Sequence, residues 1–242
     1  MAGNPYTESG EKFKIPDMLA NRADTYNLGE IIGGSADAFE LSYLENSLTS
    51  NPVLAKVATR SQKDVYGLIR MAEDGAVEDV DLEGNYSLAE VNEMVGVMKK
   101  LLRVRDVVLA VNQEYIRSAG MADDYRTEPA FKLQGSYRNM NRIAERVVGV
   151  MNDEELETLI LASYQNDSQT LTTGAESNLL KFKELIGRLS EEETARWDAI
   201  RKTYRRNVQL QGVGDDAKFG QLILQLTNFA ESLDAIKHAM KS

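Results

Sequence analysis

The stretch Phe131-Lys-Leu-Gln-Gly-Ser-Tyr-Arg-Asn-Met-Asn-Arg-Ile-Ala-Glu-Arg-Val-Val148 combines a helix start with a run of basic groups. Gly135-Ser136 suits a turn followed by an N-cap, because a serine oxygen there accepts a backbone N–H of the first helical turn. The helical spacing of the apolar residues after it predicts one buried side, formed by Met140, Ile143, Ala144 and Val147.

Arg138 falls in the first turn of this predicted helix. A cation is unfavourable at the positive end of a helix dipole, where carboxylates and phosphates are favoured. We therefore expect Arg138 either to pair with a nearby acid or, together with the free N–H groups of that turn, to bind a phosphate. A solvated arginine on the surface of an acidic helical protein is the third interpretation that this stretch leaves open.

Composition bounds the class of protein. The chain has 242 residues, of which 27% are charged and 43% hydrophobic, with only 4 prolines, as is typical of a helix-rich globular protein. Its net charge of -10 argues against nonspecific binding to nucleic acid, although a local basic face leaves direct nucleic-acid binding open. No apolar run approaches a membrane span and no signal peptide is evident, so we expect a cytoplasmic protein that does not enter a membrane.

Several kinds of chemistry are excluded by residues that the sequence lacks. There is no cysteine and only one histidine, His238, which argues against thiolate or histidine metal sites and against a Ser-His-Asp triad. The acidic clusters lie at predicted helix starts or in loops, where the helix dipole and solvation explain them, so we predict no metal site. Gly33-Gly34 is not followed by lysine, and no phosphate-binding P-loop motif occurs, so the chain by itself should not hydrolyse a nucleotide.

Most of the chain shows helical periodicity. It begins at Ser35, and its first apolar stripes end at Pro52 and Gly75. Ser87-Leu-Ala-Glu90 has the spacing of a capping box and predicts a helix that runs to Gly120. The apolar residues of this long helix are interpreted as core: Val91, Met94, Val95, Met98, Leu101, Leu102, Val108 and Val111.

The C-terminal third is predicted to be a helical hairpin or small bundle. A cap at Asn152 to Glu155 starts one helix, and a further helix is expected over residues 171–189. Ser190 to Glu193 is a second capping box, which opens a helix reaching about Gly212, and the last helix covers about 215–240.

Two basic clusters accompany these helices. Arg138, Arg142 and Arg146 are spaced to share one helix face, either contacting phosphate or paired with acids in solvent. The densest cluster, Arg201, Lys202, Arg205 and Arg206, either contacts a nucleic-acid backbone or forms a solvated or partner-binding surface.

The first 34 residues differ from the rest, since they hold two of the prolines and extended or loop-like pieces. The ordered series Ala2-Gly-Asn4-Pro5, Glu8-x-Gly10, Ile15-Pro16-Asp17 and Leu19 to Arg22 resembles the second half of the ATPase module of MoxR-like AAA+ proteins. Gly135-Ser-Tyr-Arg138 looks like the element that opens a lid helix in the same families. The sequence from Ile15 to the C-terminus also resembles bacterial AAA proteins that are commonly labelled DNA repair ATPases.

This resemblance implies specific roles. Asn4 would be the sensor 1 residue, which orients the attacking water near the γ-phosphate of ATP. Arg22 would be an arginine finger that reaches into a neighbouring subunit's site, and Arg138 would be sensor 2, which contacts the phosphates from the lid. The spacing before Arg138 is one residue shorter than in many MoxR relatives, and Arg22 precedes Ala23-Asp24 rather than an aromatic residue.

We therefore expect a mainly α fold in three parts: an α/β remnant of an AAA+ core at 1–34, a lid-like helical domain at 35–165, and a C-terminal helical bundle at 166–242. The expected function is the sensor and lid portion of an AAA+ ATPase in DNA repair or another remodelling process. It would act with ATP and Mg²⁺ only beside a P-loop-bearing segment, in a homo-oligomeric ring. On this view the chain is the C-terminal part of a longer protein or a separate reading frame. The alternative is a non-enzymatic helical module that binds partner helices.

Overall fold

The computed structural model describes residues 36–75, 81–211, 226 and 229. These residues are mainly helical and contain no β-strand, so the mainly α fold is confirmed for the described part of the chain. The predicted α/β remnant at 1–34 lies outside the described residues. So does the last predicted helix, apart from Leu226 and Phe229, which are helical.

The chain divides into two compact units. Unit 1 holds the described residues up to Gly120 together with Phe131–Arg188, and unit 2 holds residues 121–130 and those from Leu189 onward. A helix, α8, runs without a break through residues 165 and 166, where the sequence analysis placed a domain boundary. The AAA+ lid identity of residues 35–165 stays a prediction.

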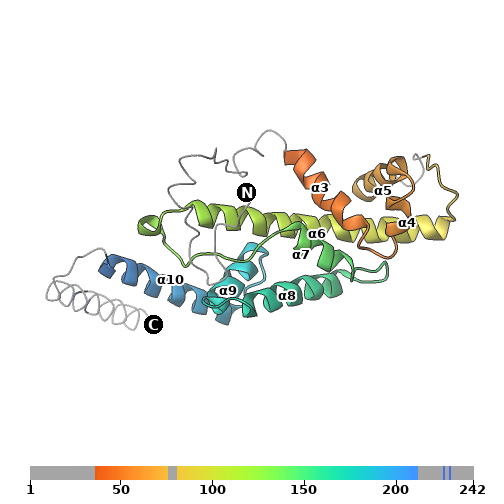
Figure 1. Ribbon diagram of the computed structural model, residues 1–242. Coiled ribbons are helices and arrows are strands. Elements are labelled where there is room, and N and C mark those ends of the chain that lie inside the picture. The colour runs from red at the N-terminus through yellow and green to blue at the C-terminus, as the bar shows by residue number, and fades with distance from the viewer. Residues whose placement is uncertain (1–35, 76–80, 212–225, 227–228, 230–242) are drawn as a thin grey trace, which may run out of the picture. The chain divides into compact units, whose positions relative to one another are not determined.

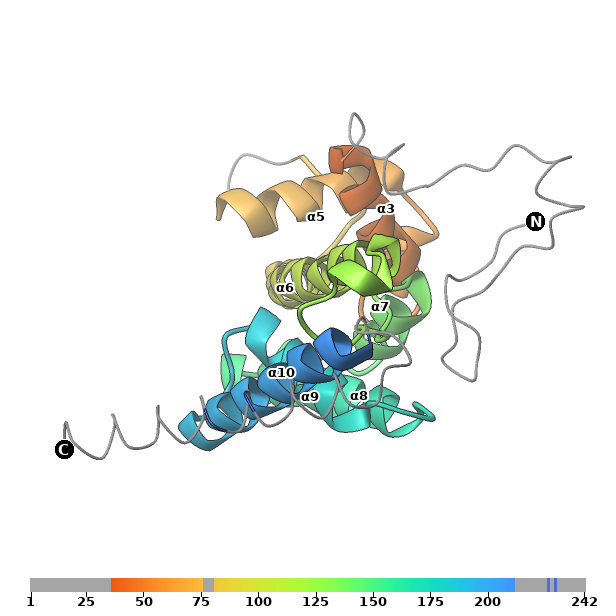
Figure 2. The ribbon, with the colours of Figure 1, turned by 90° about the vertical axis from the view of Figure 1, so that its left-hand side faces the viewer.

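Unit 1 is arranged around one long helix, α6 (Figure 1). The helices α3, α5, α7 and α9 all pack on it. Figure 2 looks along α6 and shows α3 and α5 on one side of it and α8 and α9 on the other. The helices of this unit are α3 (Ala36–Leu48), α4 (Ala55–Ala58), α5 (Gln62–Asp74), α6 (Leu88–Gly120), α7 (Tyr137–Ala144), α8 (Asp153–Gln169) and α9 (Ala175–Leu185).

Local capping signals set the starts of several helices. Ser87 and Glu90 form the predicted capping box: the Ser87 N–H donates to the Glu90 carboxylate at 2.8 Å, and the Glu90 N–H donates to the Ser87 hydroxyl at 3.3 Å. The helix then reaches Gly120 as predicted. Asn152 and Glu155 form the same box at the start of α8. The helix expected over 171–189 is shorter, because Gly174 and Gly187, with φ of 80° and 67°, bound α9 in left-handed conformations.

The core of unit 1 is centred on the apolar stripes of α6. All eight residues predicted for this stripe are buried, including both methionines, which confirms their interpretation as core. Each Å² of apolar surface that these side chains remove from water stabilises the fold by about 25 cal/mol. The same long helix therefore serves as the support for the shorter helices on either side.

A buried carboxylate, Asp64, connects α5 to the loop before α6. It accepts hydrogen bonds from the N–H groups of Glu83 and Gly84 at 2.6 and 3.0 Å and from the Tyr86 hydroxyl at 3.1 Å. Burial by itself raises the pKa of Asp64, but these donors together with Ser61 outweigh burial and lower the pKa below its ordinary value. The ionised carboxylate is thus part of the fold.

Unit 2 contains η2 (Asp123–Tyr125) and α10 (Glu191–Gln211). The predicted capping box of Ser190 and Glu193 is confirmed: the Ser190 N–H donates to the Glu193 carboxylate and the Glu193 N–H donates to the Ser190 hydroxyl, each at 3.1 Å. None of the helices in the described part of the chain is both long enough and apolar enough to cross a membrane.

Candidate functional site

The start of α7 is the place where the sequence predicted a phosphate contact. Ser136 is its N-cap, with an extended backbone, and its hydroxyl accepts from the Asn139 N–H at 3.4 Å. In return, Asn139 Oδ1 accepts from the Ser136 N–H at 3.1 Å, which completes a capping box. The predicted N-cap is confirmed, and so is the buried side of the helix, because Met140, Ile143, Ala144 and Val147 are all buried.

Gly135, just before the cap, lies unusually close to α6. A Cβ atom on Gly135 would come within 1.9 Å of the Val108 carbonyl oxygen and within 2.5 Å of the Asn112 nitrogen. Only a residue without a side chain allows the chain to pass α6 at this distance. The Gly135 carbonyl accepts a hydrogen bond of 2.8 Å from the buried Tyr43 hydroxyl of α3. The segment before α7 is therefore held between α3 and α6.

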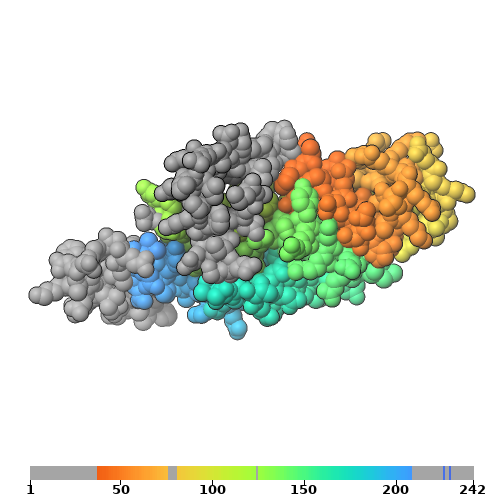
Figure 3. Space-filling view, in the orientation of Figure 1, coloured from red at the N-terminus to blue at the C-terminus, as the bar shows by residue number. Residues whose placement is uncertain are grey.

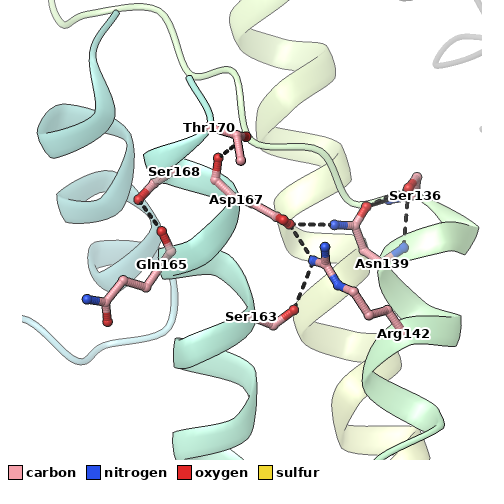
Figure 4. Close-up of polar contacts among 8 residues, drawn as sticks. All are labelled: Ser136, Asn139, Arg142, Ser163, Gln165, Asp167, Ser168 and Thr170. Carbon is pink, nitrogen blue, oxygen red and sulfur yellow. Dashed lines mark hydrogen bonds and ion pairs between the residues drawn. The ribbon is translucent and has the colours of Figure 1, made fainter. Parts of the chain in front are cut away.

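Asp167 of α8 binds two side chains from the first two turns of α7. Its Oδ2 accepts from Asn139 Nδ2 at 2.9 Å and from Arg142 Nη2 at 2.6 Å. Arg142 also donates to the Ser163 hydroxyl at 2.9 Å. Figure 4 shows these side chains converging from α7 and α8. Asn139 thus serves the cap with its oxygen and the neighbouring helix with its nitrogen.

Two tyrosines stack beside the cap. The rings of Tyr43 and Tyr137 lie 4.2 Å apart, and the Tyr137 hydroxyl shares a hydrogen bond of 2.7 Å with the Ser42 hydroxyl. Burial raises the pKa of Tyr43 to about 12, and Tyr137 adds to this shift. The Tyr43 hydroxyl therefore stays protonated near neutral pH and remains a donor to Gly135. In the space-filling view of Figure 3, α7 meets α3 on one side and α8 on the other.

Arg138 lies in the first turn of α7, between Tyr137 and Asn139, and its side chain is exposed. Its side chain makes no ion pair or hydrogen bond with another residue in the part of the chain that the structure describes. The Asn139 N–H is used by the cap, whereas the N–H groups of Tyr137 and Arg138 have no acceptor within the helix itself. An exposed guanidinium and two backbone donors therefore share one end of α7.

The predicted basic stripe does not form as expected. α7 ends at Ala144, so Arg146 lies in the following turn rather than on the same helix face. Arg142 is paired with Asp167, an acid 25 residues away, and its charge is thereby already balanced. Within the described part of α7 and the turn after it, the exposed Arg138 and Arg146 are the arginines without an ion pair.

The other two predicted site residues, Asn4 and Arg22, lie outside the described residues, and their distance to Arg138 stays a prediction. The sequence analysis missed Asn139, Asp167 and Tyr43. The spacing of Ser136 and Asn139 matches a capping box with asparagine in place of glutamate, and that signal could have identified Asn139. No sequence signal points to Asp167 or Tyr43, because both act across helix contacts.

The second basic cluster lies on α10 in unit 2. Arg201 pairs with Asp198 at 2.5 Å, and its guanidinium lies 5.3 Å from the centre of the Trp197 ring. Arg205 donates to the Thr127 carbonyl at 3.1 Å. At least two of the four cations thus have interactions inside unit 2.

Among the described residues, no group of three or more acidic or histidine side chains could hold a metal ion. No family model, curated protein or solved structure matches this chain.

Proposed function

We propose that this chain is the sensor and lid portion of an AAA+ ATPase and that Arg138 contacts the phosphates of ATP from the first turn of α7. The observation that carries this proposal is the state of Arg138: it is exposed and has no ion pair in the described part of the chain, although its neighbours on both sides are held by other helices. A helix start favours anions through its dipole and its free N–H groups. A guanidinium at that place binds phosphate with charge-assisted hydrogen bonds.

The residues at this site fit a phosphate group better than a carboxylate from the described part of the chain. The nearest acid of the network, Asp167, is already bonded to Asn139 and Arg142. Arg142, one helical turn beyond Arg138, is paired with Asp167. Arg138 is therefore the arginine at the helix start that is left for a ligand. Because the described residues offer no acidic cluster for a metal, Mg²⁺ would be held by the nucleotide and the P-loop-bearing segment.

The remaining roles rest on the sequence resemblance. Asn4 orients the attacking water and Arg22 completes the site of a neighbouring subunit in a homo-oligomeric ring, whose head-to-tail interfaces allow one subunit to supply an arginine to the next. ATP hydrolysis in this cytoplasmic assembly drives remodelling, with DNA repair as the process that the resemblance favours. The chain contributes sensing and lid closure, while the P-loop-bearing segment contributes nucleotide binding.

The test compares ATP turnover by the full chain combined with its P-loop-bearing segment. The variant Arg138→Ala is expected to lower turnover at least tenfold, since removing one charge-assisted contact to a transferring phosphate costs on the order of 1.4 kcal/mol or more. Arg146→Ala is the matched control, because Arg146 is also exposed and lies at the other end of α7. Asn4→Ala should also lower turnover at least tenfold.

Unchanged turnover in Arg138→Ala would overturn the proposed role. An equal loss in Arg146→Ala would point to general charge rather than to a site at the helix start. If the combined chains do not hydrolyse ATP at all, the non-enzymatic helical module becomes the better interpretation.

A further inference from the structure

One helix, α3, contacts α7 near both of its ends. At the start of α7, the Tyr43 hydroxyl donates to the Gly135 carbonyl. At its end, the amide of Asn51, in the turn after α3, donates to the carbonyls of Ala144 and Val147 at 2.8 and 2.9 Å. Asn51 is fully buried, so both donors are shielded from water. The two contacts fix the position of α7 along α3.

The Tyr43 hydroxyl is bonded to Gly135, the residue just before the N-cap Ser136. On the α6 side, the backbone of Gly135 has no room to move closer, because even a Cβ atom would collide with Val108. On the α3 side, the Tyr43 hydroxyl holds the Gly135 carbonyl at 2.8 Å. This hydrogen bond and the close approach to α6 therefore both restrain Ser136 and the first turn of α7.

The residues on both sides of Arg138 are also held. Tyr137 stacks on the Tyr43 ring and bonds Ser42, whereas Asn139 bonds Asp167. The backbone of Arg138 is consequently fixed while its side chain is exposed. A group held in this way loses less conformational freedom when it binds a ligand, which is the advantage of preorganisation.

We infer that Tyr43 is a positioning residue for the phosphate contact of Arg138, acting through the hydrogen bond to Gly135. This inference rests on the proposed function of Arg138.

The first test measures the helix start without any nucleotide. Tyr43→Phe keeps the stacked ring and removes only the hydroxyl. It is expected to raise amide hydrogen exchange at Asn139 and Met140, whose N–H groups are bonded to Ser136, at least threefold, with little change at the end of α7. Ser42→Ala, which removes the bond to the Tyr137 hydroxyl, should give a smaller increase at the same amides. Unchanged exchange in both variants would overturn the inference.

The matched control is Tyr66→Phe. The hydroxyl of Tyr66, in α5, donates a hydrogen bond of 2.5 Å to the carboxylate of Glu45, in α3. This bond joins α3 to α5 and does not involve α7. This variant removes the same chemical group and one hydrogen bond of α3. Exchange at Asn139 and Met140 should stay at the parent level, and an equal increase would indicate a general loosening of α3.

The second test uses ATP turnover of the full chain with its P-loop-bearing segment. Tyr43→Phe should lower kcat about five- to tenfold with little change in KM, the size expected for losing one buried hydrogen bond. The double variant with Arg138→Ala should be no slower than Arg138→Ala alone, because a positioning residue acts through the residue that it positions. Independent, multiplying losses would show a structural role only.

These outcomes separate the two proposals. If Arg138→Ala leaves turnover unchanged, the proposed function fails, whatever Tyr43 does. If Arg138→Ala lowers turnover but Tyr43→Phe does not, the phosphate contact stands and the positioning role of Tyr43 is wrong.

Discussion

The carboxylate of Asp167 in α8 and the side-chain amide of Asn139 in α7, two residues 28 positions apart in the chain, are joined by a hydrogen bond of 2.9 Å. Asn139 also closes the capping box of α7 with its carbonyl oxygen. One residue thus ties a local helix signal to the packing of α7 on α8. The geometry of the helix start depends on both.

Replacing Asp167 by alanine should destabilise unit 1 and loosen α7. Asn139 is buried and would lose its acceptor, and Arg142 would lose its ion pair. We expect Asp167→Ala to lower the free energy of unfolding by about 1–3 kcal/mol, as for other buried donors left without a partner. Urea denaturation measures this change. Asp106→Ala is the control, since Asp106 is itself exposed, although it pairs with its neighbour Arg105, and its loss should change stability by less than about 0.5 kcal/mol.

Substituting Gly135 should show how closely the chain passes α6. In Gly135→Ala the new methyl group meets backbone atoms of α6, which cannot rotate away as a side chain can. We expect a loss of about 1–3 kcal/mol in the free energy of unfolding, the usual size for overpacking. Gly96→Ala, inside the same helix, meets no atom closer than 4.0 Å and should be neutral or stabilising by up to about 1 kcal/mol. Equal effects of the two variants would contradict this reading of the contact.

Tyr43 should make the protein sensitive to alkaline pH. Its pKa is raised in the folded state from 10.0 to about 12, so the folded chain holds the proton more tightly than the unfolded chain does. This contribution to stability is complete below pH 10 and is lost as the pH rises toward about 12. Thermal unfolding followed between pH 9 and 12 measures the loss, which should be smaller in Tyr43→Phe than in the parent protein. A parallel pH dependence in both proteins would exclude Tyr43 as its source.

Asp64 should act in the opposite direction, at acid pH. Its pKa lies below the ordinary value of 3.8, so its contribution is present above that pH and is lost as the pH falls through the folded-state pKa. Asp64→Asn keeps the shape but replaces one acceptor oxygen with a donor, which faces backbone N–H groups. We expect a loss of about 1–3 kcal/mol in the free energy of unfolding near neutral pH. The difference from the parent should narrow below pH 4, and a constant difference down to pH 2 would contradict the assignment.

Much of the helical organisation could be predicted from the sequence because its signals are local. The caps at Ser87, Asn152 and Ser190 join residues three positions apart, and such spacing is independent of the rest of the fold. The apolar stripe of α6 is likewise a property of one helix. The helix expected over 171–189 was predicted too long. Its ends depend on the left-handed backbone conformation of Gly174 and Gly187, which bound the shorter helix α9.

The sequence by itself determined the mainly helical class, the caps of the long helices and the place of Arg138 in a first helical turn. Only the tertiary structure decided that Arg142 is paired with Asp167 while Arg138, of the same residue type and one turn away, has no ion pair in the described part of the chain. Helix packing brings Asp167 close to Arg142, and it likewise brings Tyr43 close to Gly135. Contacts between residues 25 or 92 positions apart leave no periodic pattern in the chain, because they depend on how whole helices fit together.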